Sequence, residues 1–343
     1  MKLPLPITDL PLQAALTSPH FIDLCGGARS GPDLSTAQEL SAGLCAEAAS
    51  VAPKYFYNAL GCKLFEAITV LGEYYPTRTE AGIFEASLGE MASAVAQAGI
   101  TQPCLIDLGA GNCAKAMALM PHLRPQQYVP VDISVDFMRE AAGQVQTRFP
   151  ALDILGLGMD FSAGLALPPE VQGHDRVFFY PGSSLGNFAP DEALRFLRQL
   201  ADPARGRGRG LLLGIDLVKD TATLEAAYDD ALGVTAAFNK NLLLHLNTLL
   251  GADFDVTQWR HVALFNTAQS RIEMHLQASC ELTVRWPGHA RHFSQGERIH
   301  TENSYKYTLQ GMTALLRQAG FSQTRYWADS QQWFAVFWAA APG

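Results

Sequence analysis

Short apolar segments alternate with helix-like segments over residues 104–216, and this alternation limits the fold more than any other feature of the chain. Helix-like spacing of apolar residues occurs at 113–122 and 134–148. Such alternation is typical of a parallel sheet with helices on both faces, because each parallel crossover needs a long connection. We therefore predict an α/β fold that binds its ligand at the carboxyl ends of the strands. The predicted strands are 104–108, 128–132, 153–157, 176–180 and 210–216.

The segments outside this alternation predict two additions to the sheet. Residues 320–343 contain two aromatic runs joined by the polar ADSQQ, which predicts a hairpin that closes the sheet with an antiparallel strand. The TRTE motif at 77–80 fits a capping box that opens a helix. The remaining segments mix helix-like and strand-like patterns, and we expect them to form a second, substrate-binding α+β domain. The predicted division assigns 1–78 and 217–303 to the second domain, and 79–216 and 304–343 to a Rossmann-like domain.

Charge and hydropathy limit the partners of the chain. The net charge is −8, which argues against nucleic acid or an anionic membrane as the main partner. The Arg-Gly run at 204–210 is short and leads into a predicted strand, so we interpret it as a solvated turn. No apolar run reaches the roughly 18–20 residues that span a bilayer. We expect a small-molecule substrate and no membrane partner, with a monomer as the simplest arrangement.

The six cysteines are scattered and lack the spacing of metal ligands. The N-terminal segment also lacks the basic region and apolar block of a secretory signal. We therefore expect reduced thiols, a cytoplasmic location and no metal site. The cysteines are Cys25, Cys45, Cys62, Cys104, Cys113 and Cys280.

A glycine turn follows the first predicted strand. GAGNCA, at 109–114, matches the G-x-G-x-x-A pattern of dinucleotide-binding turns. Asp132 ends the next strand, 21 residues after Gly111, where a carboxylate can bind ribose hydroxyls. A nicotinamide-dependent oxidoreductase is therefore one interpretation of this region.

Asp107, just before the turn at Gly109 and Gly111, favours a different ligand. A carboxylate at this place would repel the pyrophosphate of a dinucleotide, whereas it would attract the cationic S-adenosylmethionine. Lys115 could then neutralise the methionyl carboxylate. Asp160 and Phe161 follow the third strand, where they could accept from the adenine amino group and pack on its ring. The predicted cofactor site is Asp107, Gly109, Gly111, Lys115, Asp132, Asp160 and Phe161.

The fourth predicted strand runs into PGSSLGNF at 181–188, where a transferred methyl group should emerge. Asn187 could hold a polar group of the substrate there. The same residue is equally consistent with an Asn that only forms a turn.

Several long motifs together resemble the histidine Nα-methyltransferases of ergothioneine biosynthesis, from about Pro53 to the C-terminus. That family uses S-adenosylmethionine to trimethylate the α-amine of L-histidine, giving hercynine. The resemblance implies a Rossmann-like domain and a substrate domain assembled from N-terminal and mid-chain segments. The motifs are PKYFYNALGCKLFEAITVLGEYYPTRTE, DLGAGNCAK, FFYPGSSLGNF, YDDALGVTAAFNKNLL, RIEMHL and IHTENSYKY.

The resemblance also assigns roles to residues. Asn187 and Tyr228 would hold the substrate carboxylate, and Tyr57 would lie near the amine as the catalytic residue. Glu302 and Ser304 match the residues that bind the imidazole. The implied substrate site is Tyr57, Tyr74, Asn187, Tyr228, Met274, Glu302 and Ser304. Two alternatives stay open at this point: N-methylation of another amino acid or small amine, and a non-catalytic protein that binds S-adenosylmethionine.

Overall fold

A computed structural model describes residues 18–24, 34–162, 164–171, 175–202 and 209–342. Cys25 and residues 204–208 of the Arg-Gly run lie outside these ranges. The other five cysteines are all free thiols. None of the helices in the described ranges is long and apolar enough to cross a membrane.

One mixed sheet of eight strands forms the centre of the structure. The strands β1 to β6 pair in parallel, although their order in the sheet differs from their order in the sequence. β13 and β12 then continue the sheet beyond β6 in antiparallel pairing. The predicted strands and the closing C-terminal hairpin are therefore confirmed. In sheet order, the strands are β1 (His20–Asp23), β4 (Asp153–Gly158), β3 (Gln127–Asp132), β2 (Cys104–Leu108), β5 (Arg176–Tyr180), β6 (Arg209–Asp216), β13 (Phe334–Ala340) and β12 (Gln323–Ala328).

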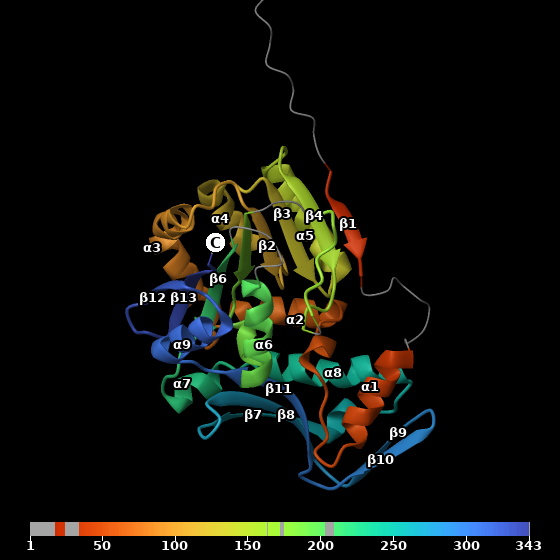
Figure 1. The fold of residues 1–343 in the computed structure, drawn as a ribbon. Helices are drawn as coiled ribbons and strands as arrows, with labels where there is room; N and C mark the ends of the chain where they lie inside the picture. Colours follow the sequence, from red (N-terminus) through yellow and green to blue (C-terminus); the bar gives the residue numbers. More distant parts are fainter. Residues whose placement is uncertain (1–17, 25–33, 163, 172–174, 203–208, 343) are drawn as a thin grey trace, which may run out of the picture.

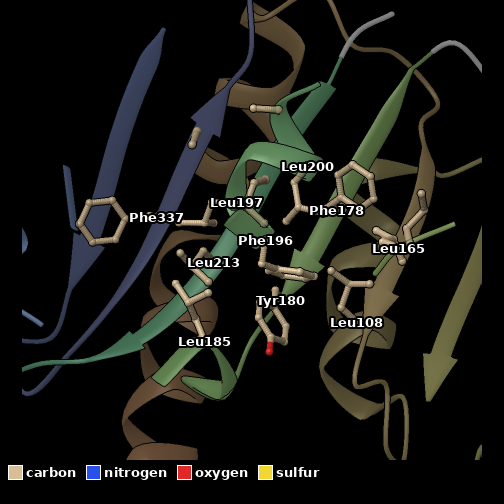
Figure 2. Packing of buried hydrophobic residues seen from close by; sticks show 14 of the residues in the cluster. Leu108, Leu165, Phe178, Tyr180, Leu185, Phe196, Leu197, Leu200, Leu213 and Phe337 are labelled. Atoms are coloured by element: carbon tan, nitrogen blue, oxygen red, sulfur yellow. The ribbon is translucent and has the colours of Figure 1, made fainter. Parts of the chain in front are cut away.

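Helices cover both faces of this sheet, as the sequence alternation predicts. One core cluster packs α6 and α9 against one face, and another packs α3, α4 and α5 against the opposite face. Figure 2 shows the first cluster, in which Phe196 of α6 lies among side chains of β5 and β6. The helices are α3 (Tyr75–Gln97), α4 (Ala114–Leu123), α5 (Val135–Arg148), α6 (Pro190–Ala201) and α9 (Leu309–Ala319).

A second group of elements lies beyond one end of the large sheet (Figure 1). Its core cluster joins residues from 40–75 with residues from 224–299. The antiparallel sheet β11-β8-β7 packs there against α8, next to the β9–β10 hairpin. The elements are α1 (Leu34–Cys45), η1 (Pro53–Phe56), α2 (Ala59–Thr69), α7 (Thr221–Ala226), α8 (Val234–Leu250), η4 (Val256–Gln258), β7 (Trp259–Asn266), β8 (Arg271–Ala278), β9 (Leu282–Trp286), β10 (His289–Phe293) and β11 (Arg298–Tyr305).

Two strands lie differently from the predicted division of the chain. β1 comes from the segment expected in the second domain, yet it pairs with β4 at the edge of the large sheet. β11 continues past residue 303 and pairs with β8 as far as Tyr305, so the predicted boundary cuts through a strand. With these two differences, the division into domains stays a prediction.

The capping box predicted at 77–80 is wrong. The helix α3 begins earlier, at Tyr75, with Pro76 in its first turn. The side chain of Glu80 is fully buried and bonds to distant residues instead of the start of the helix. A tertiary ion pair has therefore replaced the local interaction that the motif predicts.

We expect Gly210→Ala to lower the free energy of unfolding by about 1–3 kcal/mol, because it overpacks the sheet. A Cβ atom at Gly210 would lie 1.8 Å from the indole of Trp338. Gly143→Ala is the matched control, since Gly143 is exposed in α5 and a Cβ there meets nothing within 4 Å. Urea unfolding should show Gly143→Ala unchanged or up to about 1 kcal/mol more stable. Equal stability of the two variants would contradict the packing.

Candidate active site

A cleft of about 620 Å³ opens where β2, β3, β4 and β5 end. It brings together six of the residues predicted from the sequence, which come from segments far apart in the chain. Side chains of α6 and of η2 (Ser184–Asn187) complete the cleft. The predicted cofactor residues that line it are Gly109, Asp132, Asp160 and Phe161, and the predicted substrate residues that line it are Tyr57 and Asn187.

The glycine turn has the backbone that its sequence requires. Gly109 and Gly111 have φ of +70° and +52°, a region that side chains with a Cβ rarely adopt. Asp132 supports the turn, because its carboxylate accepts from the N–H of Gly111 at 2.9 Å and of Ser134 at 2.8 Å. Each carboxylate oxygen retains a further lone pair, so Asp132 can also accept from a ligand hydroxyl.

Asp107 lies beneath the turn and not among the residues that line the cleft. Its side chain is buried and accepts from the hydroxyl of Tyr128 at 2.8 Å. Its other carboxylate oxygen, Oδ1, has no hydrogen-bond partner within the described part of the chain. Burial raises the pKa of Asp107 to about 7, against the opposing effects of Tyr128 and Lys115. A cation bound at the turn would favour the ionised form.

Lys115 is held by a residue that sequence reasoning missed. Its Nζ lies 2.5 Å from the carboxylate of Glu80, and the other oxygen of Glu80 accepts from the N–H of Gly182 at 2.8 Å. Glu80 therefore fixes Lys115 between the glycine turn and the loop after β5. Since an ammonium has three N–H donors, Lys115 retains donors for a ligand carboxylate.

The opposite end of the cleft combines acids with an aromatic wall. Asp160 lies 3.3 Å from Nζ of Lys54, which is also 2.9 Å from Glu39. The ring of Phe161 packs edge-on against Tyr180, with centroids 5.7 Å apart. Such a wall suits a flat apolar ring, because edge and face contacts between aromatic groups are favourable.

The charges around the cleft suit a cation. Four acidic residues line it, Glu39, Asp132, Asp160 and Glu192, against the two bases Lys54 and Arg195. With Lys54 already paired, a diphosphate would meet mainly negative charge, whereas a sulfonium would be attracted. The unpartnered oxygen of Asp107 beneath the turn also favours a cationic ligand. The residues present therefore fit S-adenosylmethionine.

A second set of predicted residues gathers beside the cleft. Tyr57 follows η1, and Tyr74 directly precedes α3. The ring of Tyr74 packs edge-on against Tyr228, at 6.3 Å between centroids. Phe65, which the sequence did not single out, contacts both Tyr57 and Tyr74. These aromatic side chains form one wall shared by N-terminal and mid-chain segments.

Glu302 adds a half-buried acid to this wall. Burial raises its pKa to about 7, and the charge of Lys306 opposes the shift. The pKa values of Tyr57, Tyr74 and Tyr228 are all raised well above the ordinary range, first by burial and then by neighbouring acidic groups that include Glu302. The three phenols therefore stay protonated at neutral pH and act only as hydrogen-bond partners.

Ser304 lies two residues after Glu302 on β11, so both side chains face the same side of the strand. Its hydroxyl accepts from the hydroxyl of Tyr228 at 2.8 Å and from Nζ of Lys306 at 2.9 Å. Met274 pairs with Glu302 across the sheet, but its side chain is buried in the core and lines neither cavity.

A second cavity of about 290 Å³ adjoins the cleft. Glu302, His300 and Asn303 of β11 line it, and Asn187 and Glu39 border both cavities. Asn187 thus lies at the meeting point of the predicted cofactor and substrate residues. No group of three or more His, Cys, Asp or Glu able to hold a metal ion occurs in the ranges that the structure describes.

Sequence reasoning missed several charged residues that shape the site. Asp216, at the end of β6, is buried and forms ion pairs with Lys219 and Lys306. The available signal was an acid at the end of an apolar strand, the same signal that identified Asp107 and Asp132. The pairing of Lys54 with Asp160 left no comparable signal, because the two residues come from separate segments.

The fold and the cleft define a Rossmann-like methyltransferase that uses S-adenosylmethionine. A profile of the family described as "Histidine-specific methyltransferase, SAM-dependent" matches residues 36–341. The chain therefore belongs to this family, and the resemblance drawn from its motifs is confirmed. The interpretation of the glycine turn as a nicotinamide site is wrong, because the family depends on S-adenosylmethionine.

Individual relatives agree with the family. Histidine N-alpha-methyltransferase of Mycolicibacterium smegmatis is 40% identical, with 85% of this chain and 90% of the relative covered. The protein of the same name from Mycobacterium tuberculosis is 39% identical, with 90% and 95% covered. Ergothioneine biosynthesis protein 1 of Neurospora crassa is 28% identical, with 81% of this chain but only 32% of that protein covered.

We expect Asp132→Ala to weaken binding of S-adenosylhomocysteine by about tenfold or more, since the carboxylate supports the turn and offers acceptors to the ligand. Calorimetric titration measures the change. Asp136→Ala is the control, because Asp136 is exposed on α5 and does not line the cleft. Unchanged affinity in Asp132→Ala would remove this residue from the cofactor site.

Proposed function

We propose that this protein transfers methyl groups from S-adenosylmethionine to the α-amino group of L-histidine, three in succession, giving Nα,Nα,Nα-trimethylhistidine (hercynine). One observation carries the proposal. The carboxylate of Glu302, which lines the adjoining cavity, and the buried hydroxyls of Ser304 and Tyr228 gather beside the cleft that fits the cofactor. The names of the mycobacterial relatives and of the Neurospora crassa protein support the substrate and its place in ergothioneine biosynthesis.

The grouping of an acid with two hydroxyls suits an imidazole ring. A neutral imidazole carries one N–H donor and one bare nitrogen, so it needs an acceptor on one side and a donor on the other. Ionised Glu302 is an acceptor only, and the hydroxyls of Ser304 and Tyr228 can donate. A site of this kind rejects an apolar amino acid, because that ligand would leave the buried polar groups unpaired.

The reaction itself asks the protein mainly for positioning. The cofactor supplies a methyl group on a positively charged sulfur, and a neutral amine with a free lone pair accepts it. Asn187, at the meeting point of the two cavities, can hold the substrate carboxylate. The resemblance implies this role for Tyr228 as well, but its hydroxyl donates to Ser304, so we place Tyr228 with the ring-binding group instead. Tyr57 can then direct the amine lone pair toward the cleft that it lines.

The role of Tyr57 follows from its environment. Since burial and the charge of Glu302 raise its pKa, the phenol does not serve as a base at neutral pH. It orients the amine through a hydrogen bond, and the amine loses its proton to water. A cation in the neighbouring cleft lowers the pKa of an α-amine and so assists this loss.

Purified protein incubated with L-histidine and S-adenosylmethionine should yield products that carry one, two and three added methyl groups, which mass spectrometry resolves. The positional assignment is checked by using imidazole-methylated histidines as reference compounds. Binding of S-adenosylhomocysteine by the same preparation shows that the enzyme is intact. Intact cofactor binding without any methylated histidine would refute the proposed substrate.

A competition assay over the other amino acids and small amines tests the alternative that the substrate is one of these. Under the proposal, histidine is methylated at the highest kcat/KM of the panel. A different amino acid or amine that is methylated faster would replace histidine as the substrate while leaving the reaction class intact.

We expect the KM for histidine to rise by about tenfold as the pH falls from 8 to 6. The raised pKa of about 7 leaves Glu302 ionised at pH 8 and protonated at pH 6, where the neutral carboxyl accepts more weakly from the ring N–H than the carboxylate does. Glu302→Gln is the control, because its amide keeps an acceptor at every pH. A parallel pH profile in the variant, after allowance for the titration of free histidine, would contradict this role for Glu302.

The location and assembly of the protein complete the proposal. The free thiols among the described residues are consistent with a reducing compartment, so we propose a cytoplasmic location. We also propose a monomer as the active form, the simplest arrangement for this chain.

A further inference from the structure

Lys306 lies directly behind the proposed imidazole site and uses all its hydrogen-bonding capacity there. Its ammonium is completely buried, 2.8 Å from a carboxylate oxygen of Asp216. It also lies 2.9 Å from Oγ of Ser304 and 3.1 Å from the hydroxyl of Tyr228. An ammonium has three N–H donors, and these three acceptors account for all of them.

Asp216 holds this ammonium in place. Its carboxylate also accepts from Lys219 at 2.6 Å and from the hydroxyl of Tyr75 at 2.7 Å. Lys219 and Lys306 together keep the pKa of Asp216 low despite its burial. Since Lys306 is anchored by an ionised partner, its two remaining N–H groups are directed at Ser304 and Tyr228.

The donation by Lys306 determines what the two hydroxyls can offer a ligand. The hydroxyl of Tyr228 accepts from Lys306 and donates to Ser304, at 2.8 Å. Oγ of Ser304 then accepts from both Tyr228 and Lys306, which uses both of its lone pairs. Its own hydrogen has no acceptor in the described structure. If the bond between the two hydroxyls is reversed, Tyr228 carries the spare hydrogen instead.

We propose that Lys306 is a positioning and specificity-determining residue: by donating to Ser304 and Tyr228 at once, it makes this hydroxyl pair a hydrogen-bond donor toward the substrate ring. The inference rests on the proposed function and deepens it. Lys306 acts through the two hydroxyls and does not itself contact the substrate.

The donor pair and the acceptor Glu302 together specify one form of the imidazole. The bare ring nitrogen faces the hydroxyl pair, and the ring N–H faces the carboxylate. The opposite tautomer would set N–H against a hydroxyl hydrogen and a bare nitrogen against a carboxylate. An imidazolium would also be disfavoured, because its second N–H would meet the donor pair with the Lys306 charge behind it.

Nitrogen NMR tests the inference on the unaltered protein. Histidine labelled with ¹⁵N in the ring is bound at pH 8 in the presence of S-adenosylhomocysteine, which permits binding without transfer. The expected spectrum has one fully bare and one fully protonated ring nitrogen, whereas free histidine at this pH averages two tautomers. A bound ring that is doubly protonated, or that remains a tautomer mixture, overturns the inference.

A variant isolates the contribution of Lys306. Lys306→Met removes the donors at similar length, and Lys219→Met is the matched control. Lys219 is also buried and paired with Asp216, but it contacts neither Ser304 nor Tyr228. Both variants lose one cation from the same carboxylate, so a purely structural role predicts the same effect for the two.

The readout is a ratio of kcat/KM values. The 4-thiazolyl and 5-thiazolyl analogues of histidine place one bare nitrogen at either ring position without an N–H, and thienylalanine has no ring nitrogen. The wild-type protein and Lys219→Met should prefer one thiazolyl analogue over thienylalanine by about tenfold. In Lys306→Met this preference should fall to about twofold or less. A preference that Lys306→Met retains in full overturns the inference.

These measurements separate the inference from the function on which it rests. If the wild-type protein does not methylate histidine, the proposed function fails. If it methylates histidine and the ring is bound as a single tautomer, but Lys306→Met leaves the preference intact, the function stands and the role of Lys306 fails. Should loss of the buried ion pair unfold Lys306→Met, the NMR measurement on the unaltered protein can still overturn the inference, because a doubly protonated ring or a tautomer mixture contradicts it.

Discussion

The buried carboxylate of Asp216 connects the large sheet with the second group of elements. It ends β6 of the large sheet and bonds to Tyr75 at the start of α3, to Lys219, and to Lys306 just after β11. Its backbone N–H donates to the hydroxyl of Ser183, which lies between β5 and η2. A buried charge is costly unless its partners are all in place, so this contact favours one relative placement of the cofactor and substrate elements. The proposed active site forms along that junction.

The sequence predicts the large sheet well because its signals are local. Each strand between 104 and 216 is a short apolar run, and the parallel direction of neighbouring strands follows from the helices between them. β1 escaped the prediction, since the four residues His20–Asp23 join the sheet only through pairing with β4. The motif at 77–80 misled for a related reason: Glu80 satisfies a local helix-start pattern, yet a distant ion pair with Lys115 determines its position.

The residues of the site also divide into those that have a local sequence signal and those that do not. Acids that end strands, such as Asp132 and Asp160, can be identified from the sequence, because the topology brings successive strand ends to one edge. Apart from Asn187, the substrate residues came from resemblance alone, since nothing in the local pattern distinguishes Glu302 from a solvated turn. Contacts such as Lys306 with Asp216 join residues from separate segments and leave no period in the sequence, so only the structure reveals them.

The place of β13 in the sheet has a consequence for how the protein is made. This wholly buried strand lies between β6 and β12, although it is encoded long after β6. During synthesis, the apolar edge of β6 therefore stays unpaired until residues 334–340 have left the ribosome. An open edge of this kind is a template for pairing with other chains. Until then the nascent enzyme carries an open edge of the kind that makes incompletely folded chains prone to aggregation.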